Sequence, residues 1–200
     1  CAATSNTVKL PYYILFPTKI LHFRPTGHTC SGLMLPIVLT SATLKVGLAG
    51  RGAERDRRAA LLAEAGVEAR LLPQNAPDAL LAGLQLLFVA GLPEGESRDL
   101  ASRARAHGVL VNVEDMLALC DFHVPAIVRR GDLLITASTG GQVPGLARAL
   151  RENLSEAFGP EWTGRLKELG LARARWRSEG LSMSQVSQKL RDMIAAMGWL

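Results

Sequence analysis

A chain of 200 residues, 48% of them hydrophobic, is long and apolar enough to bury the core of one or two compact units. It has no apolar run of the roughly 18–20 residues that a membrane-spanning helix requires, so we expect a soluble protein that does not enter a membrane. The formal net charge is only +5, and residues 1–33 hold three basic and no acidic side chains, which leaves 20 basic against 18 acidic residues elsewhere. A nucleic-acid partner is therefore not predicted.

Residues 1–33 differ in composition from the rest of the chain. They show no period typical of a helix or a strand, and Pro11, Pro17, Lys19 and Arg24 interrupt any apolar core of a signal peptide. We expect this unassigned arm to be poorly ordered or foreign to the native protein.

Strands and helices alternate along residues 43–113. Apolar strand patterns cover residues 43–48, 67–72, 84–90 and 109–113, and helical patterns cover 53–65 and 97–107. This alternation predicts an α/β fold with a Rossmann-like parallel sheet, and residues 34–113 are assigned to one NAD-binding domain. Only residues 73–83 separate the second strand from the third, so a reduced sheet is expected.

A glycine-rich turn leads from the first strand into the first helix, where main-chain amides could face a pyrophosphate. The candidate NAD-binding residues are those of the turn and of the start of the helix: Gly50, Arg51, Gly52, Ala53 and Glu54. The usual fingerprint is altered, because Arg55 occupies its third small position, where it would crowd the helix against the strand.

A second departure follows the next strand. Leu71-Leu72-Pro73-Gln74 stands where an acid usually binds the ribose, and Arg70 is only a faint hint of a 2′-phosphate. The glycine turn alone is therefore as compatible with a plain strand–helix connection as with a dinucleotide site.

The pattern changes after residue 113. Residues 122–128 and 133–137 are predicted to be two strands joined by a hairpin turn at 129–132, and a helix is predicted from Pro144 to about Phe158. Two further helices are expected at about 161–179 and 183–197, the second beginning at a capping box of Ser182 and Gln185. Residues 148–200 therefore form a helical C-terminal region.

Three motifs together carry a family resemblance: Asn112-Val113-Glu114-Asp115, Phe122-His123-Val124-Pro125-Ala126, and Ser138-Thr139-Gly140-Gly141 followed by Pro144. Over about residues 34–158, and more weakly to the end, the chain resembles the dehydrogenase/ferrochelatase domain of siroheme synthases. The resemblance implies NAD-dependent oxidation of precorrin-2 to sirohydrochlorin, with insertion of Fe²⁺, as a substrate, being a further activity of many relatives. It also implies a homodimer formed through residues 114–147, the dimerisation and substrate region.

Asp115 is the residue predicted to carry the chemistry. It follows the end of a parallel strand, where a carboxylate can take up a proton while hydride leaves the substrate. From the residues alone, a turn-capping role is favoured. The resemblance reverses this preference, because the essential carboxylate of the family is the Asp of this motif. His123 is a second catalytic candidate, as a proton relay, although a packed histidine is the commoner case.

The substrate-binding candidates come from the same motifs and the helix that follows them: Asn112, Thr139, Gly140, Gly141 and Arg148. Asn112 could orient the substrate or equally pair a strand end. The Gly-Gly loop opens a helix whose amides favour anionic groups, although a tight strand–helix turn needs the same glycines. Arg148 could meet a carboxylate of a tetrapyrrole or be an ordinary surface arginine.

No resident metal site is predicted. His123 has no second His or Cys at ligand spacing, and Cys1, Cys30 and Cys120 form neither a disulfide framework nor a zinc pattern. Cys120 is expected to be a small buried residue rather than a nucleophile, and the cysteine usage fits a reducing, cytoplasmic setting. Two other functions stay open: a non-catalytic NAD- or tetrapyrrole-sensing module and, third, a DNA-binding unit beginning near residues 176–186.

Overall fold

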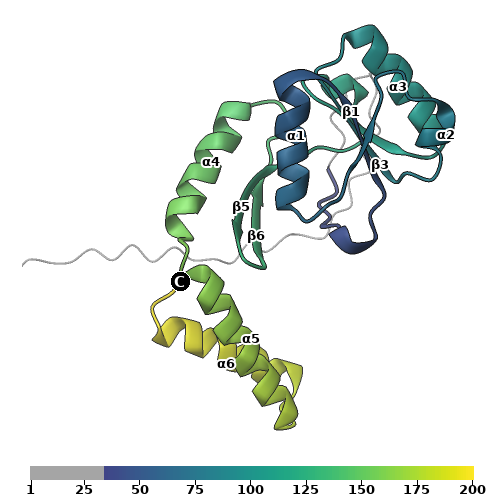
Figure 1. Ribbon diagram of the computed structural model, residues 1–200. Coiled ribbons are helices and arrows are strands. Elements are labelled where there is room, and N and C mark those ends of the chain that lie inside the picture. Colours follow the sequence, from purple (N-terminus) through teal and green to yellow (C-terminus); the bar gives the residue numbers. More distant parts are fainter. Residues whose placement is uncertain (1–33) are drawn as a thin grey trace, which may run out of the picture. The chain divides into compact units, whose positions relative to one another are not determined.

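The computed structural model describes residues 34–200, so the expectations for residues 1–33 fall outside the described part. A four-stranded parallel sheet with the order β2-β1-β3-β4 confirms the predicted α/β, Rossmann-like fold (Figure 1). After a short 3-10 turn, η1 (Ser41–Thr43), the elements are β1 (Val46–Gly50), α1 (Gly52–Glu64), β2 (Arg70–Leu72), α2 (Asp78–Leu81), β3 (Leu86–Ala90), α3 (Glu94–Ala106) and β4 (Leu110–Val113).

The two central strands, β1 and β3, are buried along their whole length, which explains their uninterrupted apolar sequences. Helix α1 packs Leu62 on one face of the sheet, beside Leu48 and Phe88. Helix α3 covers the other face with Leu100 and neighbouring alanines. The sheet is therefore a central layer with helices on both faces.

Strand β2 differs most from its predicted form. It begins at Arg70, and of its three residues only Leu72 is buried. As an edge strand it pairs with β1 alone, so its extension is supported from one side only. Between β2 and β3 the structure has the single-turn helix α2 and no strand.

A separate antiparallel hairpin follows, formed by β5 (Ala126–Arg130) and β6 (Leu133–Ala137). Its turn consists of residues 131–132, so β5 extends further toward the turn than predicted, and residues 122–125 are not strand. Helix α4 (Pro144–Ala157) packs on this hairpin. The Arg130 guanidinium donates to the carbonyl oxygens of Ser155 at 3.1 Å and Phe158 at 2.7 Å, which fixes the end of α4 to β5.

Two packed helices complete the chain, α5 (Trp162–Ser178) and α6 (Met183–Ala196). The predicted capping box is present at the start of α6, with the Ser182 and Gln185 side chains each bonded to the other residue's main-chain amide. Trp162 and Trp176 are buried in this region. None of the helices within residues 34–200 has the length and apolar character needed to cross a membrane.

Two glycines allow the turn after β1 to touch the turn after β3. A Cβ on Gly50 would overlap the carbonyl oxygen of Ala90, and a Cβ on Gly91 would overlap the carbonyl oxygen of Arg51. The two glycines also have positive φ angles, +148° and +68°. Because main-chain atoms cannot swing aside like the tip of a side chain, only glycine fits at these positions.

Gly50→Ala should lower the free energy of unfolding by at least about 3 kcal/mol, since the main chain of β3 must move to admit the methyl group. Gly95→Ala in α3 is the matched control, because its Cβ would meet nothing within 4 Å. That variant should keep its stability or gain up to about 1 kcal/mol. Urea unfolding followed by circular dichroism measures both, and equal stability of the two variants would contradict the close approach.

Candidate active site

The carboxyl ends of β1 and β3 form the edge at which the candidate residues meet. These strands are parallel neighbours, and their last paired residues are Gly50 and Ala90. From β1 the chain continues to β2 on one side of the sheet, and from β3 it continues to β4 on the other side. The strand order therefore reverses between β1 and β3. Open α/β sheets bind ligands at such a reversal. The amide of Arg51 donates to the carbonyl oxygen of Ala90 at 3.2 Å and joins the two turns.

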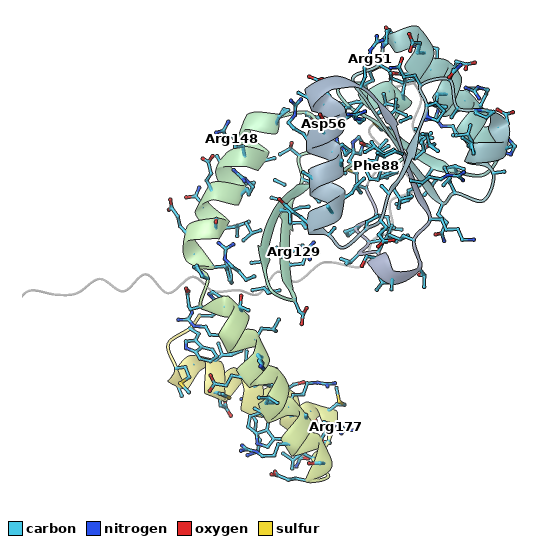
Figure 2. All side chains as sticks on the ribbon, viewed as in Figure 1. Arg51, Asp56, Phe88, Arg129, Arg148 and Arg177 are labelled. Carbon is cyan, nitrogen blue, oxygen red and sulfur yellow. The ribbon has the colours of Figure 1, made fainter. Side chains whose placement is uncertain are left out.

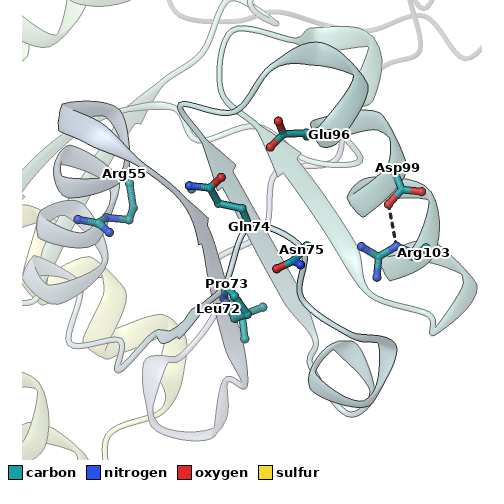
Figure 3. A pocket seen from close by; sticks show the side chains of 9 residues that line it. Arg55, Leu72, Pro73, Gln74, Asn75, Glu96, Asp99 and Arg103 are labelled. Atoms are coloured by element: carbon teal, nitrogen blue, oxygen red, sulfur yellow. Dashed lines mark hydrogen bonds and ion pairs between the residues drawn. The ribbon is translucent and has the colours of Figure 1, made fainter.

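Beside this edge lies a hollow of about 670 Å³, a size typical of small-molecule sites (Figure 3). Figure 3 shows Gln74 and Asn75, which follow β2, between Arg55 of α1 and Glu96 and Asp99 of α3. The full lining comprises Gly50, Arg55, Leu72, Pro73, Gln74, Asn75, Glu96, Asp99 and Arg103. Polar side chains thus dominate the hollow.

Of the five predicted NAD-binding residues, one lines this hollow and the others follow that residue in the chain. Gly50 lines it, and Gly52, Ala53 and Glu54 form the first turn of α1, whose N-terminus has no side-chain cap. The amides of that turn are therefore free to face an anionic ligand group. Arg51 contributes differently, because its amide already bonds to the β3 end.

Arg55 does not crowd the sheet, contrary to expectation. Helix α1 continues through it, and its guanidinium pairs with Asp56 at 2.6 Å and lines the hollow. The arginine of α1 that faces the sheet is Arg58, whose guanidinium carbon lies 5.4 Å from the centre of the Phe88 ring. Arg70 lies at the opposite end of β2 and does not line the hollow, so it offers no contact to a ribose phosphate there.

Three charged residues of α3 line the hollow although the sequence motifs do not mark them: Glu96, Asp99 and Arg103. Arg103 donates to carboxylate oxygens of Asp99 and Asp78, each at 2.9 Å. The hydrogen bond from Arg103 lowers the pKa of Asp78 below its ordinary value. No local signal could have found this group, because α3 reaches the end of β2 only once the sheet has formed.

Asp115 lies in the turn immediately after β4, at the same edge of the sheet. The residue is exposed, and within residues 34–200 it is the only non-glycine with a positive φ, +59°. A left-handed conformation costs a non-glycine residue roughly 1–2 kcal/mol, and Asp tolerates it better than most. The predicted strand-end position is thus present, on a constrained backbone.

Cys120 supports the base of the Asp115 turn. Its thiol lies within hydrogen-bonding distance of the carbonyl oxygens of Val113, at 3.2 Å, and Met116, at 3.4 Å, and its sulfur accepts from the amide of Val113 at 3.3 Å. Burial raises the pKa of the Cys120 thiol, so the thiol stays protonated and able to donate. A partly buried, protonated cysteine is a poor nucleophile, in keeping with its predicted structural role.

Asn112 is buried at the end of β4, and its carboxamide Nδ2 donates to the carbonyl oxygen of Phe122 at 2.9 Å. Asn112 was expected either to orient the substrate or to pair a strand end, and this contact matches the second role. His123, the residue after Phe122, is partly buried. Within residues 34–200, no three His, Cys, Asp or Glu side chains come together as metal ligands.

The Gly-Gly loop packs against the Asp115 turn. Gly141 approaches Leu117 so closely that a Cβ there would overlap the leucine side chain. Leu117 begins the short turn η2 (Leu117–Leu119), two residues after Asp115. The Thr139 hydroxyl donates to the carbonyl oxygen of Val143 at 3.1 Å and holds the loop in shape. Gly140 and Gly141 both have positive φ, so the loop needs its glycines on structural grounds too.

Arg148 lies on the outer surface of α4 (Figure 2). Its side chain is 76% exposed and pairs with Glu152 at 3.0 Å. It does not line the hollow of Figure 3. The described structure therefore brings the Asp115 turn and the Gly-Gly loop together. Like Arg148, these residues do not line the hollow beside β2.

The chain is similar to several known proteins. Residues 37–126 match the protein family described as "Putative NAD(P)-binding". The chain is 31% identical over 155 residues to a siroheme synthase of Methylococcus capsulatus, which covers 68% of this chain and 32% of the relative. It is 41% identical over 125 residues to a siroheme synthase of Pseudomonas putida, covering 62% and 26%. The chain thus spans no more than about a third of the length of these relatives.

A solved structure described as "SirC, precorrin-2 dehydrogenase" is also similar. Its TM-score is 0.63 at 19% sequence identity, and the similarity covers 80% of this chain and 89% of that one. The two proteins therefore share their fold over most of both chains.

Burial of Cys120 leads to a test of thiol chemistry. In a Cys1→Ser/Cys30→Ser background, the native chain should react with a thiol reagent at least about tenfold more slowly than the urea-unfolded chain. Burial raises the pKa of the Cys120 thiol in the folded state above its value in the unfolded state. The neutral thiol therefore contributes fully to stability at pH values below the unfolded-state pKa. This contribution is lost as the pH rises through the folded-state pKa. Ser184→Cys, an exposed position on α6, is the reactive control. Equal rates for the native and unfolded chains would contradict this picture.

Proposed function

We propose, because the chain belongs to the siroheme synthase family through its NAD(P)-binding domain, that it oxidises precorrin-2 to sirohydrochlorin with NAD⁺ in the cytoplasm. The observation that carries the proposal is the position of Asp115, exposed on a constrained turn beside the ligand-binding edge of the sheet. The oxidation removes two hydrogens from the substrate, one as hydride and one as a proton. The first needs a dinucleotide and the second needs a base, and this edge offers a place for each.

The residues present fit a dinucleotide. The first turn of α1 has free amides for a pyrophosphate, and Gly50 and Gly91 let the turns after β1 and β3 meet directly beside it. The hollow of about 670 Å³ beside β2 has room for the nucleoside end. NAD⁺, when bound, supplies the hydride acceptor. Gly50, Arg51, Gly52, Ala53 and Glu54 are proposed to hold it.

Asp115 is proposed to accept the proton that leaves with the hydride. Its carboxylate is exposed, so the proton can pass on to solvent after each turnover. His123 is proposed as a relay group, since it lies in the segment that Asn112 ties to the end of β4. Both residues thus lie in segments that meet at the end of β4.

The tetrapyrrole is proposed to lie against the Gly-Gly loop and the Asp115 turn, which touch through Gly141 and Leu117. Thr139, Gly140 and Asn112 are proposed to contribute to this substrate site, and Arg148 to meet a substrate carboxylate. The same carboxylate of Asp115 could accept a pyrrole proton if Fe²⁺ is inserted into sirohydrochlorin. In that second step the iron is a substrate, and two protons leave the macrocycle.

A non-catalytic sensor of NAD or tetrapyrrole is the second candidate. It is favoured by the short sheet of four strands and by the absence of a carboxylate directly after β2, where Gln74 lines the hollow. A sensor would bind NAD⁺ tightly and leave precorrin-2 unchanged.

A homodimer is proposed from the exposed apolar surface of the hairpin region. A two-stranded sheet is marginal by itself, and β5 and β6 bury only Val128 fully. Helix α4 carries Leu146 and Leu150 at 50% and 40% exposure and has no fully buried residue. A second copy would cover this surface, within the proposed dimerisation and substrate region at residues 114–147 and the adjoining part of α4.

Asp115→Asn should reduce precorrin-2 oxidation by roughly 10²–10⁴-fold, because it removes the base while Asn tolerates the same backbone conformation. The measurement is anaerobic absorbance of sirohydrochlorin with NAD⁺, repeated after addition of Fe²⁺. Asp192→Asn on α6 is the matched control and should keep the wild-type rate. A folded wild-type chain that binds NAD⁺ without turnover would favour the sensor instead.

Leu150→Lys should weaken self-association at least about tenfold, since it places a charge on the surface that the second copy would cover. Sedimentation velocity over a range of concentrations measures the change. Leu171→Lys on α5, 65% exposed, is the control that should leave association unaltered. A wild-type chain that sediments as a monomer at all concentrations would refute the dimer.

A further inference from the structure

Glu114, the residue directly before Asp115, belongs to the most buried ion pair among residues 34–200. Its Oε1 lies 3.8 Å from Nη2 of Arg58, and the two side chains are only 18% and 14% exposed. The other carboxylate oxygen, Oε2, is buried with no hydrogen-bond partner in the described part of the chain. Burying charge is costly unless the charge is paired, so removing either partner would leave the other uncompensated.

Arg58 brings helix α1 into this pair. It lies in the second turn of α1, one turn beyond the amides that are assigned to the dinucleotide. Its guanidinium carbon lies 5.4 Å from the centre of the Phe88 ring, and Phe88 packs edge-on against Phe122 at 5.3 Å between ring centres. Arg58 is therefore held both by an aromatic ring of β3 and by the carboxylate of Glu114.

The main chain of Glu114 is fixed as well. Its amide donates to the carbonyl oxygen of Val89 at 2.9 Å, which extends the pairing of β4 with β3 by one residue. The strained conformation of Asp115 follows immediately, and strain of this kind persists only where the surrounding contacts determine the backbone. Cys120 supports the far side of the turn, and Glu114 supports the near side.

We propose that the Arg58–Glu114 ion pair is a positioning element that sets the Asp115 turn relative to the dinucleotide-binding helix. Neither residue is catalytic, because both act through the main chain of Asp115. The pair joins the cofactor helix α1 to the residue directly before the acid–base residue. A ligand bound at the start of α1 therefore also orders residues 114–120. This inference rests on the function proposed above.

The kinetic test uses Glu114→Gln, Arg58→Met, the double variant and Arg58→Lys in the full chain. The two single variants should lower kcat for precorrin-2 by roughly 10- to 100-fold, since a small displacement of an acid–base group costs this much. The dissociation constant of NAD⁺ should change by less than about threefold, because the first turn of α1 is untouched. Arg58→Lys keeps the charge and should restore most of kcat. The double variant should be no worse than the worse single one, as for two residues that act as a unit.

The matched control is Glu179→Gln, which removes the exposed pair with Arg175, 3.7 Å apart and 67% and 52% exposed. It should leave kcat unaltered. Unchanged kcat in folded Glu114→Gln and Arg58→Met, or losses that simply add in the double variant, would overturn the proposal. Urea unfolding of each variant separates a displaced turn from a loss of folded protein.

A second readout does not depend on turnover. Hydrogen exchange of the amides of residues 114–120 should slow when NAD⁺ is added to the wild type and should not respond in Arg58→Met. If the wild type binds NAD⁺ and shows this protection but never oxidises precorrin-2, the positioning pair stands and the proposed reaction fails. If NAD⁺ binds and these amides respond equally in the wild type and in Arg58→Met, the positioning pair fails while the reaction can stand.

Discussion

The contact between the turns after β1 and β3 is the constraint on which the rest of the site depends. Gly50 and Gly91 remove the side chains that would separate these turns, and the Arg51 amide then bonds to the carbonyl oxygen of Ala90. The free amides of α1 are thereby brought to the carboxyl edge of the sheet. Strand β4 pairs beside β3 and delivers Asp115 to the same edge. One backbone contact thus sets where the proposed cofactor-binding turn and the proposed acid–base residue lie along this edge.

The surroundings of Asp115 combine an exposed side chain with a firmly supported main chain. As the proposed base, the carboxylate needs solvent and substrate on one side, so it cannot be held by burial. Its position comes instead from partly buried neighbours, with Cys120 bonded to the main chain on one side and Glu114 paired with Arg58 on the other. Such a division of roles lets a strained turn persist at the proposed catalytic position. The hollow beside β2 is different, because its lining consists mainly of polar side chains.

The sequence predicted the central strands and most helices within a few residues, because continuous apolar runs and helix caps depend on near neighbours. It did less well where pairing decides the outcome. Strand β2 is short because it lies at an edge, and the hairpin begins only at Ala126 because its register with β6 sets its limits. The expected crowding by Arg55 was wrong, since its side chain turns to the hollow while Arg58 takes the place against the sheet.

The sequence by itself determined the alternation of strands and helices, the acid at the end of β4, the glycine turns and the capping box of α6. Each of these depends on residues within about one turn or one strand of each other. Tertiary structure alone decided that α3 would supply Glu96, Asp99 and Arg103 to the hollow, and that Gly141 would rest on Leu117. It likewise decided that α1 would reach Glu114 through Arg58. These contacts follow from the strand order β2-β1-β3-β4 and from the faces that the helices cover, and no local pattern encodes either of them.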